Sequence, residues 1–251
     1  MIRLRAVGLV IAALMAGSGL VLIWVARLSA DRYLYVSELG AETEPTAAVF
    51  RVALTLVAAS AAVVALCAPR LTPRIRMLAT VSPALVLGVA AVAFGVASQV
   101  PCTTYCPLPV GDAFTWQDLI HTVSAVIGFA GASLAMLQLA SDPRHRGLAR
   151  FSLFSAIAVA VIAGIGGLLS LLQFGTQVGG ILELIATSIA LGWLVGLALF
   201  LAAEFRRAAN TRATSTRAAN TRAGTTREGR AAQPQPSQAE TPPRAVATYS
   251  E

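Results

Sequence analysis

Six long apolar stretches alternate with polar segments along the first part of the chain. They cover residues 6–26, 47–68, 78–98, 118–140, 151–172 and 181–205. An α-helix rises 1.5 Å per residue, so a run of about 20 apolar residues crosses the roughly 30 Å hydrocarbon core of a bilayer. The first run is too long for the apolar core of a secretory signal, about 7–15 residues, and is read as a retained helix. The pattern predicts an all-α, polytopic membrane protein, with a six-transmembrane-helix bundle over residues 1–205.

The apolar pattern stops after residue 205. Residues 206–251 contain no Leu, Ile, Phe, Met or Trp, and arginines recur there every five residues from Arg207 to Arg227. A five-residue period matches neither a helix nor a strand, and so polar a segment cannot offset the entropy of ordering. We expect a disordered, cytoplasmic C-terminal tail whose arginines attract anionic lipid headgroups.

The distribution of arginine predicts the orientation in the membrane. The chain has 19 basic residues, all Arg, and 16 of them lie in the N-terminus, in the connections 69–77 and 141–150, and in the tail. The positive-inside rule then places both termini in the cytoplasm and the other three connections outside the cell membrane. The positive-inside rule thus accounts for the distribution of the arginines that give the net charge of +7, and charged residues make up only 12% of the chain. We therefore expect membrane lipids as partners and no nucleic acid.

Two cysteines, Cys102 and Cys106, lie in the third connection, on the side expected to be oxidising. We favour a disulfide between them over a metal site or two free thiols, because a structural zinc site usually needs four ligands. The third cysteine, Cys67, is expected to be a small buried apolar residue near a helix end. No set of residues predicts a metal or another cofactor.

Ionisable residues gather where the spans meet the predicted outer surface. Asp118 and His121 share one helix face, Glu183 begins the sixth span, and Arg51 lies near the outer end of the second. Such residues are candidates for a functional site. The structural alternative stays open: Asp118 suits the first turn of a helix, and Arg51 and Glu183 could form a structural ion pair or extend their charged groups to the membrane interface.

With these residues in view, the chain resembles a six-span membrane family known as domain of unknown function 998. Three features carry the resemblance: the segment Ser37–Ala41 after the first span, with Pro45 and Phe50 beyond it; Cys102 and Cys106-Pro107; and His121 with Ala125 and Phe129. Glu38 replaces the expected Asp, and Arg51 replaces a neutral polar residue. A fainter similarity extends to the FRAG/DRAM/Sfk group, which implies lipid handling or membrane regulation.

The loop motif Ser37–Gly40 adds Glu38 to the candidate outer polar site. If this segment folds back over the bundle, Glu38 becomes a candidate partner for His121, and Gly40 could supply a tight turn. The full candidate set comprises Glu38, Arg51, Asp118, His121 and Glu183, with Ser37 and Gly40 in the loop motif.

Three functions compete on this pattern. The favoured interpretation is a non-enzymatic membrane protein that binds a lipid or small polar ligand at its outer face, or acts as a scaffold. The alternative is a lipid hydrolase or transferase that uses His121 with Asp118 or Glu183 as acid or base. A transporter is disfavoured, because no charged residue lies near the middle of any span.

Overall fold

The computed structural model describes residues 2–68, 73, 75, 77–107, 111–172 and 174–231, without the side chains of 113, 176 and 216–231. These residues form α-helices and short 3₁₀ segments. In chain order the elements are α1 (Ile2–Ser29), η1 (Ser37–Gly40), α2 (Ala47–Cys67), α3 (Pro83–Gln99), η2 (Gly111–Ala113), α4 (Trp116–Ala140), α5 (Arg146–Leu171) and α6 (Thr176–Ala231). The chain divides into two units, residues 1–207 and 208–251.

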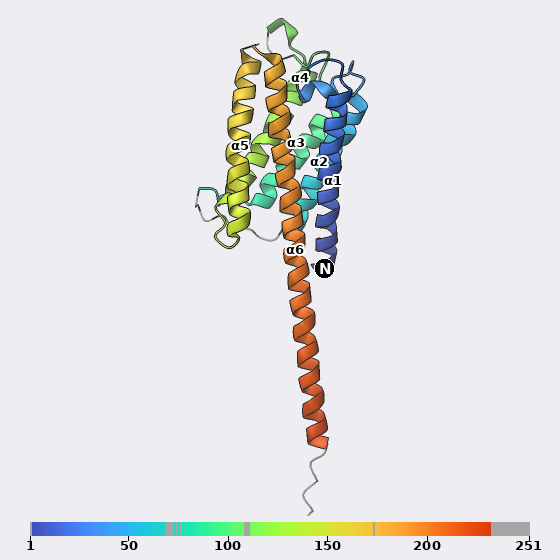
Figure 1. Ribbon diagram of the computed structural model, residues 1–251, viewed down its shortest axis with the longest axis vertical. Helices are drawn as coiled ribbons and strands as arrows, with labels where there is room; N and C mark the ends of the chain where they lie inside the picture. Colours follow the sequence, from blue (N-terminus) through green and yellow to red (C-terminus); the bar gives the residue numbers. More distant parts are fainter. Residues whose placement is uncertain are drawn as a thin grey trace, which may run out of the picture. The chain divides into compact units, whose positions relative to one another are not determined.

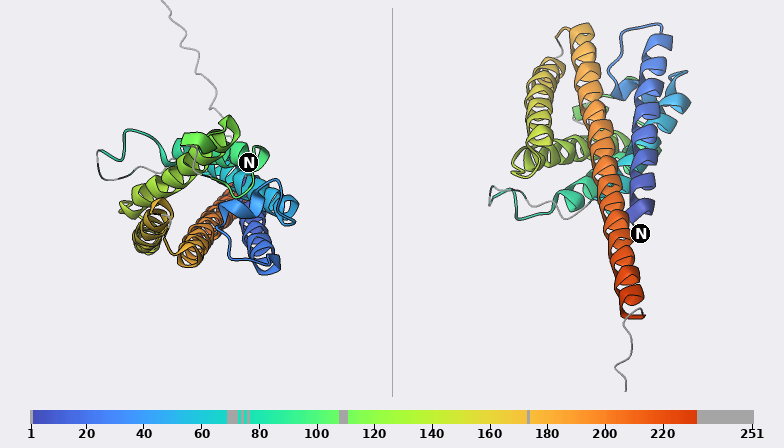
Figure 2. Two further views of the ribbon diagram at one scale, coloured as in Figure 1. Left: turned by 90° about the horizontal axis from the view of Figure 1, so that it is seen from above. Right: turned by 60° about the horizontal axis from the view of Figure 1, so that its bottom comes forward.

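In the first unit, the helices α5, α6 and α1 lie side by side in one row, with α2, α3 and α4 behind this row (Figures 1 and 2). The α1–α2, α3–α4 and α5–α6 connections meet at one end of the bundle, which we call the disulfide end. The N-terminus and the connections α2–α3 and α4–α5 lie at the other end, which we call the arginine end. The predicted grouping of connections is therefore observed.

Among the described residues, five helices are long and apolar enough to cross a membrane, and α3 is a shorter apolar helix of 17 residues. At 1.5 Å per residue α3 extends about 26 Å, which is close to the hydrocarbon thickness. The six-helix membrane architecture is confirmed.

The predicted helix boundaries needed correction where a capping residue, rather than apolarity, decides the start. The third helix does not begin at residue 78: Ser82 caps it by accepting the N–H of Leu85, and Pro83 occupies the first turn. A proline there costs no hydrogen bond. The helices α4, α5 and α6 each begin two to five residues before the predicted span, because a helix continues past the hydrocarbon edge.

Small residues allow the helices to pack closely around the main core, which we define as the buried apolar cluster that includes Leu9, Val64 and Leu197. Ser60 on α2 donates to the backbone carbonyl of Ala12 on α1 at 2.8 Å, and the indole N–H of the buried Trp193 on α6 donates to Ser152 on α5 at 3.0 Å. Such short polar contacts stabilise helix pairs in lipid, where apolar burial does not.

A second apolar cluster lies at the disulfide end, because the α1–α2 connection folds back onto the bundle. Leu34, Val36 and Leu39 from the connection are buried and pack with residues of α1, α2 and α6, among them Phe50 and Leu184. The predicted fold-back of the Ser37–Gly40 segment is therefore observed. This cluster holds the candidate site residues of the connection in place.

The helix α6 continues to Ala231 in the second unit, and the disorder expected of the tail stays a prediction. Alanine and arginine both have high helix propensity, so a continuation of α6 needs no apolar face. Residues 232–251, the rest of the predicted tail, lie outside the described residues.

Candidate functional site

Glu183, in the first turns of α6, holds the backbone of the α1–α2 connection. Its Oε2 accepts the N–H of Val36 at 2.7 Å, and the carboxylate lies close to the backbone N–H and the hydroxyl of Ser37. Val36 and Ser37 begin η1, where helix N–H groups have no partner within the helix. Glu183 therefore caps η1 from a distant helix, and this is the contact that the Ser37 motif makes.

Asp118 has a similar role in the first turn of α4. Thr115, the N-cap, accepts the N–H of Asp118 at 3.0 Å, and its hydroxyl donates back to Oδ2. This is a reciprocal capping pair. The same carboxylate accepts the N–H and the hydroxyl of Thr103, both at 2.8 Å, and its side chain is fully buried. Asp118 thus fixes the cysteine loop to α4.

The cysteine loop is closed by a disulfide between Cys102 and Cys106, as the spacing predicted. The Sγ atom of Cys102 lies 3.7 Å from the carbonyl oxygen of Ser37, and the carbonyl of Cys102 accepts the N–H of Glu42 at 3.1 Å. The α3–α4 loop and the α1–α2 connection therefore lie against each other over the end of the bundle.

His121 lies one turn below Asp118 on α4 and is 3% exposed. Its Nδ1 lies 2.8 Å from the carbonyl oxygen of Val100, so this nitrogen carries the proton and donates. Among the described residues, no hydrogen bond joins His121 to Asp118, Glu183 or Glu38. The predicted Glu38–His121 pair is therefore not formed, because a backbone carbonyl takes the imidazole proton instead.

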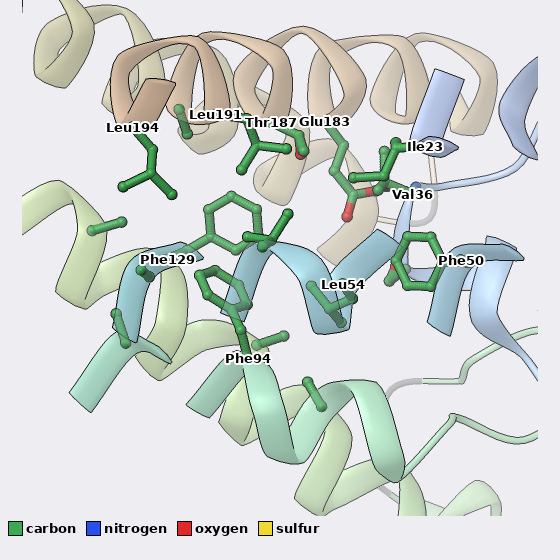
Figure 3. A pocket seen from close by; sticks show the side chains of 18 of the residues that line it. Ile23, Val36, Phe50, Leu54, Phe94, Phe129, Glu183, Thr187, Leu191 and Leu194 are labelled. Atoms are coloured by element: carbon green, nitrogen blue, oxygen red, sulfur yellow. Dashed lines mark hydrogen bonds between the residues drawn. The ribbon is translucent and has the colours of Figure 1, made fainter. Parts of the chain in front are cut away.

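Below these residues lies a cavity of about 90 Å³, counted as the space open to the centres of water-sized groups. Figure 3 shows side chains from several helices around it, with the Glu183 carboxylate at one end. The wall is almost entirely apolar, and the polar side chains that line it are those of Ser37, His121, Glu183 and Thr187. Thr187 is 5% exposed, and its hydroxyl has no hydrogen-bond partner.

Two of the predicted site residues do not face this cavity. Arg51 is exposed on α2 and does not pair with Glu183, whose carboxylate is occupied by the connection. Glu38 is half-buried and accepts the N–H of Tyr35 at 3.1 Å. Burial raises the pKa of Glu38, and the hydrogen bond from Tyr35 and the charge of Arg32 partly offset this rise.

Gly40 has a different role from the predicted tight turn. A Cβ atom at this position would lie 2.5 Å from Cδ1 of Phe50, which is the first aromatic residue of α2. The absence of a side chain lets η1 approach the ring of Phe50. Gly40 and Phe50 are therefore linked by packing, and the role of Gly40 does not depend on its backbone conformation.

Thr103 and Thr187 are site residues that the sequence pattern did not indicate. A threonine in a loop or within an apolar helix carries no charge and fits many structural roles, so neither residue stands out in the sequence. The signal for Thr103 was the capping pattern from Thr115 to Asp118, which marks a carboxylate with capacity for further donors.

The comparison with known protein families covers most of the first unit. A model of the family described as "Protein of unknown function (DUF998)" matches residues 10–200, and the chain belongs to this family. No curated protein and no solved structure matches the chain, and the similarity to the FRAG/DRAM/Sfk group was not found. The matched range includes every residue of the cavity wall.

Proposed function

We propose that this multi-pass membrane protein binds a membrane lipid, with an acyl chain in the cavity and a polar group near His121, Glu183 and Thr187. The observation that carries the proposal is the unpartnered hydroxyl of Thr187 in a cavity that is otherwise apolar. A buried hydroxyl without a partner costs about 1–3 kcal/mol. A ligand with an apolar chain and a polar group would satisfy both the wall and the hydroxyl.

The form of the cavity favours a lipid over a small polar ligand. Phe50, Phe94 and Phe129 contribute aromatic surface from three different helices, and aliphatic side chains cover most of the remainder. Apolar surface of this kind gains little from a polar molecule, whereas it suits methylene groups.

In this proposal the disulfide end faces the outside of the cell membrane and both termini are cytoplasmic. The exposed Arg144 of the α4–α5 connection and the exposed Arg146 and Arg150 in the first turns of α5 support this orientation, since positive charge is retained on the cytoplasmic side. A reporter that fluoresces only in the cytoplasm should be bright when fused after Arg207 and dark when inserted at Gly111. The reverse pattern would contradict the orientation.

Native mass spectrometry tests the lipid proposal with a matched pair of variants on α4. Ala125 lines the cavity one turn below His121, whereas Ala130 is exposed on the same helix. The protein extracted from its own membrane should carry lipid adducts that Ala125→Phe loses, because the new ring fills the cavity. Ala130→Phe should retain them.

The two variants are first compared by thermal unfolding, so that only folded protein is analysed. Equal lipid retention by wild type and a folded Ala125→Phe would contradict the proposal, as would wild-type protein that carries no lipid. If Ala125→Phe does not fold, Thr187→Val removes the polar group at nearly constant volume. It should weaken lipid retention if the hydroxyl contacts the headgroup.

A further inference from the structure

We propose that the disulfide end contains a redox-dependent metal site. When the Cys102–Cys106 disulfide is reduced, the two thiolates and His121 form a three-ligand site for a thiophilic ion such as Zn²⁺. One atom from each side chain, the two Sγ atoms and a ring nitrogen, already lies within 4.8 Å of the others. This inference rests on the cysteine loop and on His121, which also lines the cavity, and it does not require that a lipid be bound.

The distances fit zinc after a small movement. In a tetrahedral site the Zn–S distance is about 2.3 Å and the Zn–N distance about 2.0–2.1 Å, which places neighbouring ligand atoms roughly 3.3–3.8 Å apart. The Cα atoms of Cys102 and Cys106 are 5.0 Å apart. Two sulfurs on such close Cα atoms can separate to the zinc distance by side-chain rotation, without a change in the fold of the loop.

The hydrogen bond that His121 makes leaves one ring nitrogen available to a metal ion. Because Nδ1 donates its proton to the carbonyl of Val100 at 2.8 Å, Nε2 keeps the lone pair that a metal requires. A histidine that binds a metal usually has its other ring nitrogen bonded to a carbonyl or carboxylate in this way. The capped first turns of α4, held by Asp118, fix the position of the ring.

The loop also indicates that the disulfide can be opened. Tyr105 and Cys106 have φ values of 68° and 44°, a left-handed conformation that is uncommon for side chains other than glycine. Cys102 is fully buried, whereas Cys106 is only partly buried. An incoming thiol therefore reaches the sulfur of Cys106, and release of the S–S bond lets both residues relax.

The chemistry balances with a dithiol as the reductant. One thiolate of the reductant attacks Sγ of Cys106, and the S–S bond breaks, leaving Cys102 as the thiolate and the reductant bound to Cys106. The second thiol of the reductant then releases Cys106, and the reductant departs as a disulfide. Two electrons have moved to the protein. Zn²⁺ displaces the thiol protons and forms two Zn–S bonds and one Zn–N bond.

The net charge of the proposed zinc complex suits the covered end of the bundle. Two thiolates neutralise Zn²⁺, so the complex brings no net charge to a bundle end that is covered by the connection and the cysteine loop. Three protein ligands leave one tetrahedral position open for water.

Cobalt titration tests the proposal on the full-length protein in detergent. Co²⁺ replaces Zn²⁺ in thiolate sites. Its bonds to thiolate sulfur produce an intense sulfur-to-cobalt charge-transfer absorption. Protein that has been reduced and freed of reductant should bind one Co²⁺, which Zn²⁺ then displaces, whereas oxidised protein should bind none. Equal Co²⁺ binding by the two forms, or no binding by either, would overturn the proposal.

Variants identify the ligands and exclude the remaining cysteine. The chain has three cysteines, and Cys67, which packs against the main core, supplies the matched control. Reduced Cys67→Ser should bind Co²⁺ as the wild type does, and Cys102→Ser should lose the sulfur absorption. His121→Asn should weaken affinity by more than the roughly 10- to 100-fold that loss of a supporting residue costs.

The outcome can be read even if a variant is unstable. Comparison of oxidised with reduced wild-type protein needs no substitution and decides whether the site exists. Loss of binding in Cys67→Ser, or unchanged affinity in a folded His121→Asn, would overturn the assigned ligands. Lipid retention measured on the same samples is a separate readout, so failure of the metal site and failure of lipid binding remain distinguishable.

Discussion

The two histidines of the chain lie at opposite ends of the bundle and make different kinds of contact. His121 at the disulfide end is buried, donates to a backbone carbonyl and lines the cavity. His145 at the arginine end is partly exposed, with Nδ1 3.1 Å from Asp142 and Nε2 3.5 Å from Glu204. Its ring also meets Phe200 edge-on at 5.2 Å between centroids.

This difference extends to the acids around each histidine. At the disulfide end, Asp118 and Glu183 accept backbone N–H groups and hold two connections in place. At the arginine end, Asp142 is buried and accepts the N–H of Arg144 at 2.9 Å, whereas Glu204 pairs with His145 and Arg207 and its side chain is 39% exposed. Buried acceptors of backbone groups are costly to remove, whereas exposed ion pairs contribute little. We therefore expect substitution of Asp118 or Glu183 at the disulfide end to lower stability and substitution of Glu204 at the arginine end to be tolerated.

The largest effect should come from Asp118→Ala. The substitution leaves the N–H and hydroxyl of Thr103 and the hydroxyl of Thr115 without an acceptor in a buried place, so we expect a loss of roughly 3 kcal/mol or more. Denaturant unfolding in detergent measures it. The control Asp112→Ala, exposed in η2, should change the free energy of unfolding by less than about 0.5 kcal/mol. Similar losses in both variants would show that Asp118 does not fix the loop.

The second-largest loss of stability should come from removal of the disulfide. Replacing both Cys102 and Cys106 with Ser should lower the free energy of unfolding by about 2 kcal/mol, because the closed loop restricts the unfolded chain. Mass spectrometry of the unreduced protein should show the bridged peptide two protons lighter than the reduced peptide. The control Cys67→Ser leaves the loop intact and should have a smaller effect. Free thiols at both positions in native protein would contradict the bridge.

The two histidines can be compared directly. His121→Ala removes a buried donor and enlarges the cavity, so we expect a loss of about 1–3 kcal/mol that salt does not change. His145→Ala should cost about 0.2–1 kcal/mol, and this cost should shrink at high salt because the ion pairs are partly exposed. Equal losses with equal salt dependence would remove the contrast between the two ends.

The smallest effect concerns the pH response of Glu38. Its folded-state pKa is raised from 4.5 by burial, so the protonated form is favoured in the folded protein. Its contribution to stability is therefore fully present below about pH 4.5 and is lost as pH rises through the folded pKa. Glu38→Gln keeps the acceptor for Tyr35 without the charge.

Thermal unfolding from pH 4 to pH 8 measures this response. The melting temperature of Glu38→Gln relative to wild type should rise as pH increases from 4 to 7. The exposed Glu42 supplies the control, since Glu42→Gln should show no such trend. If the melting temperature of Glu38→Gln relative to that of wild type fell as pH rises, the raised pKa of Glu38 would be contradicted.

Much of the architecture follows from local chemistry that the sequence displays. The apolar runs predict the six helices, since a bilayer admits a long apolar segment only as a helix with its own hydrogen bonds satisfied. The close spacing of Cys102 and Cys106 predicts the disulfide, because two residues so near in the chain meet without help from the fold. The gathering of His121 and Glu183 at one end follows from their positions near helix ends.

The partners of those residues were decided only by the tertiary structure. Glu183 meets Val36, which lies 147 residues earlier, and His121 meets the carbonyl of Val100 rather than Glu38. Backbone donors and acceptors exist at every residue, so the sequence cannot show which of them a buried side chain will satisfy. The cavity likewise depends on the tertiary structure, because side chains from five helices surround a space that they do not fill. Packing in three dimensions makes that choice, because no local pattern contains it.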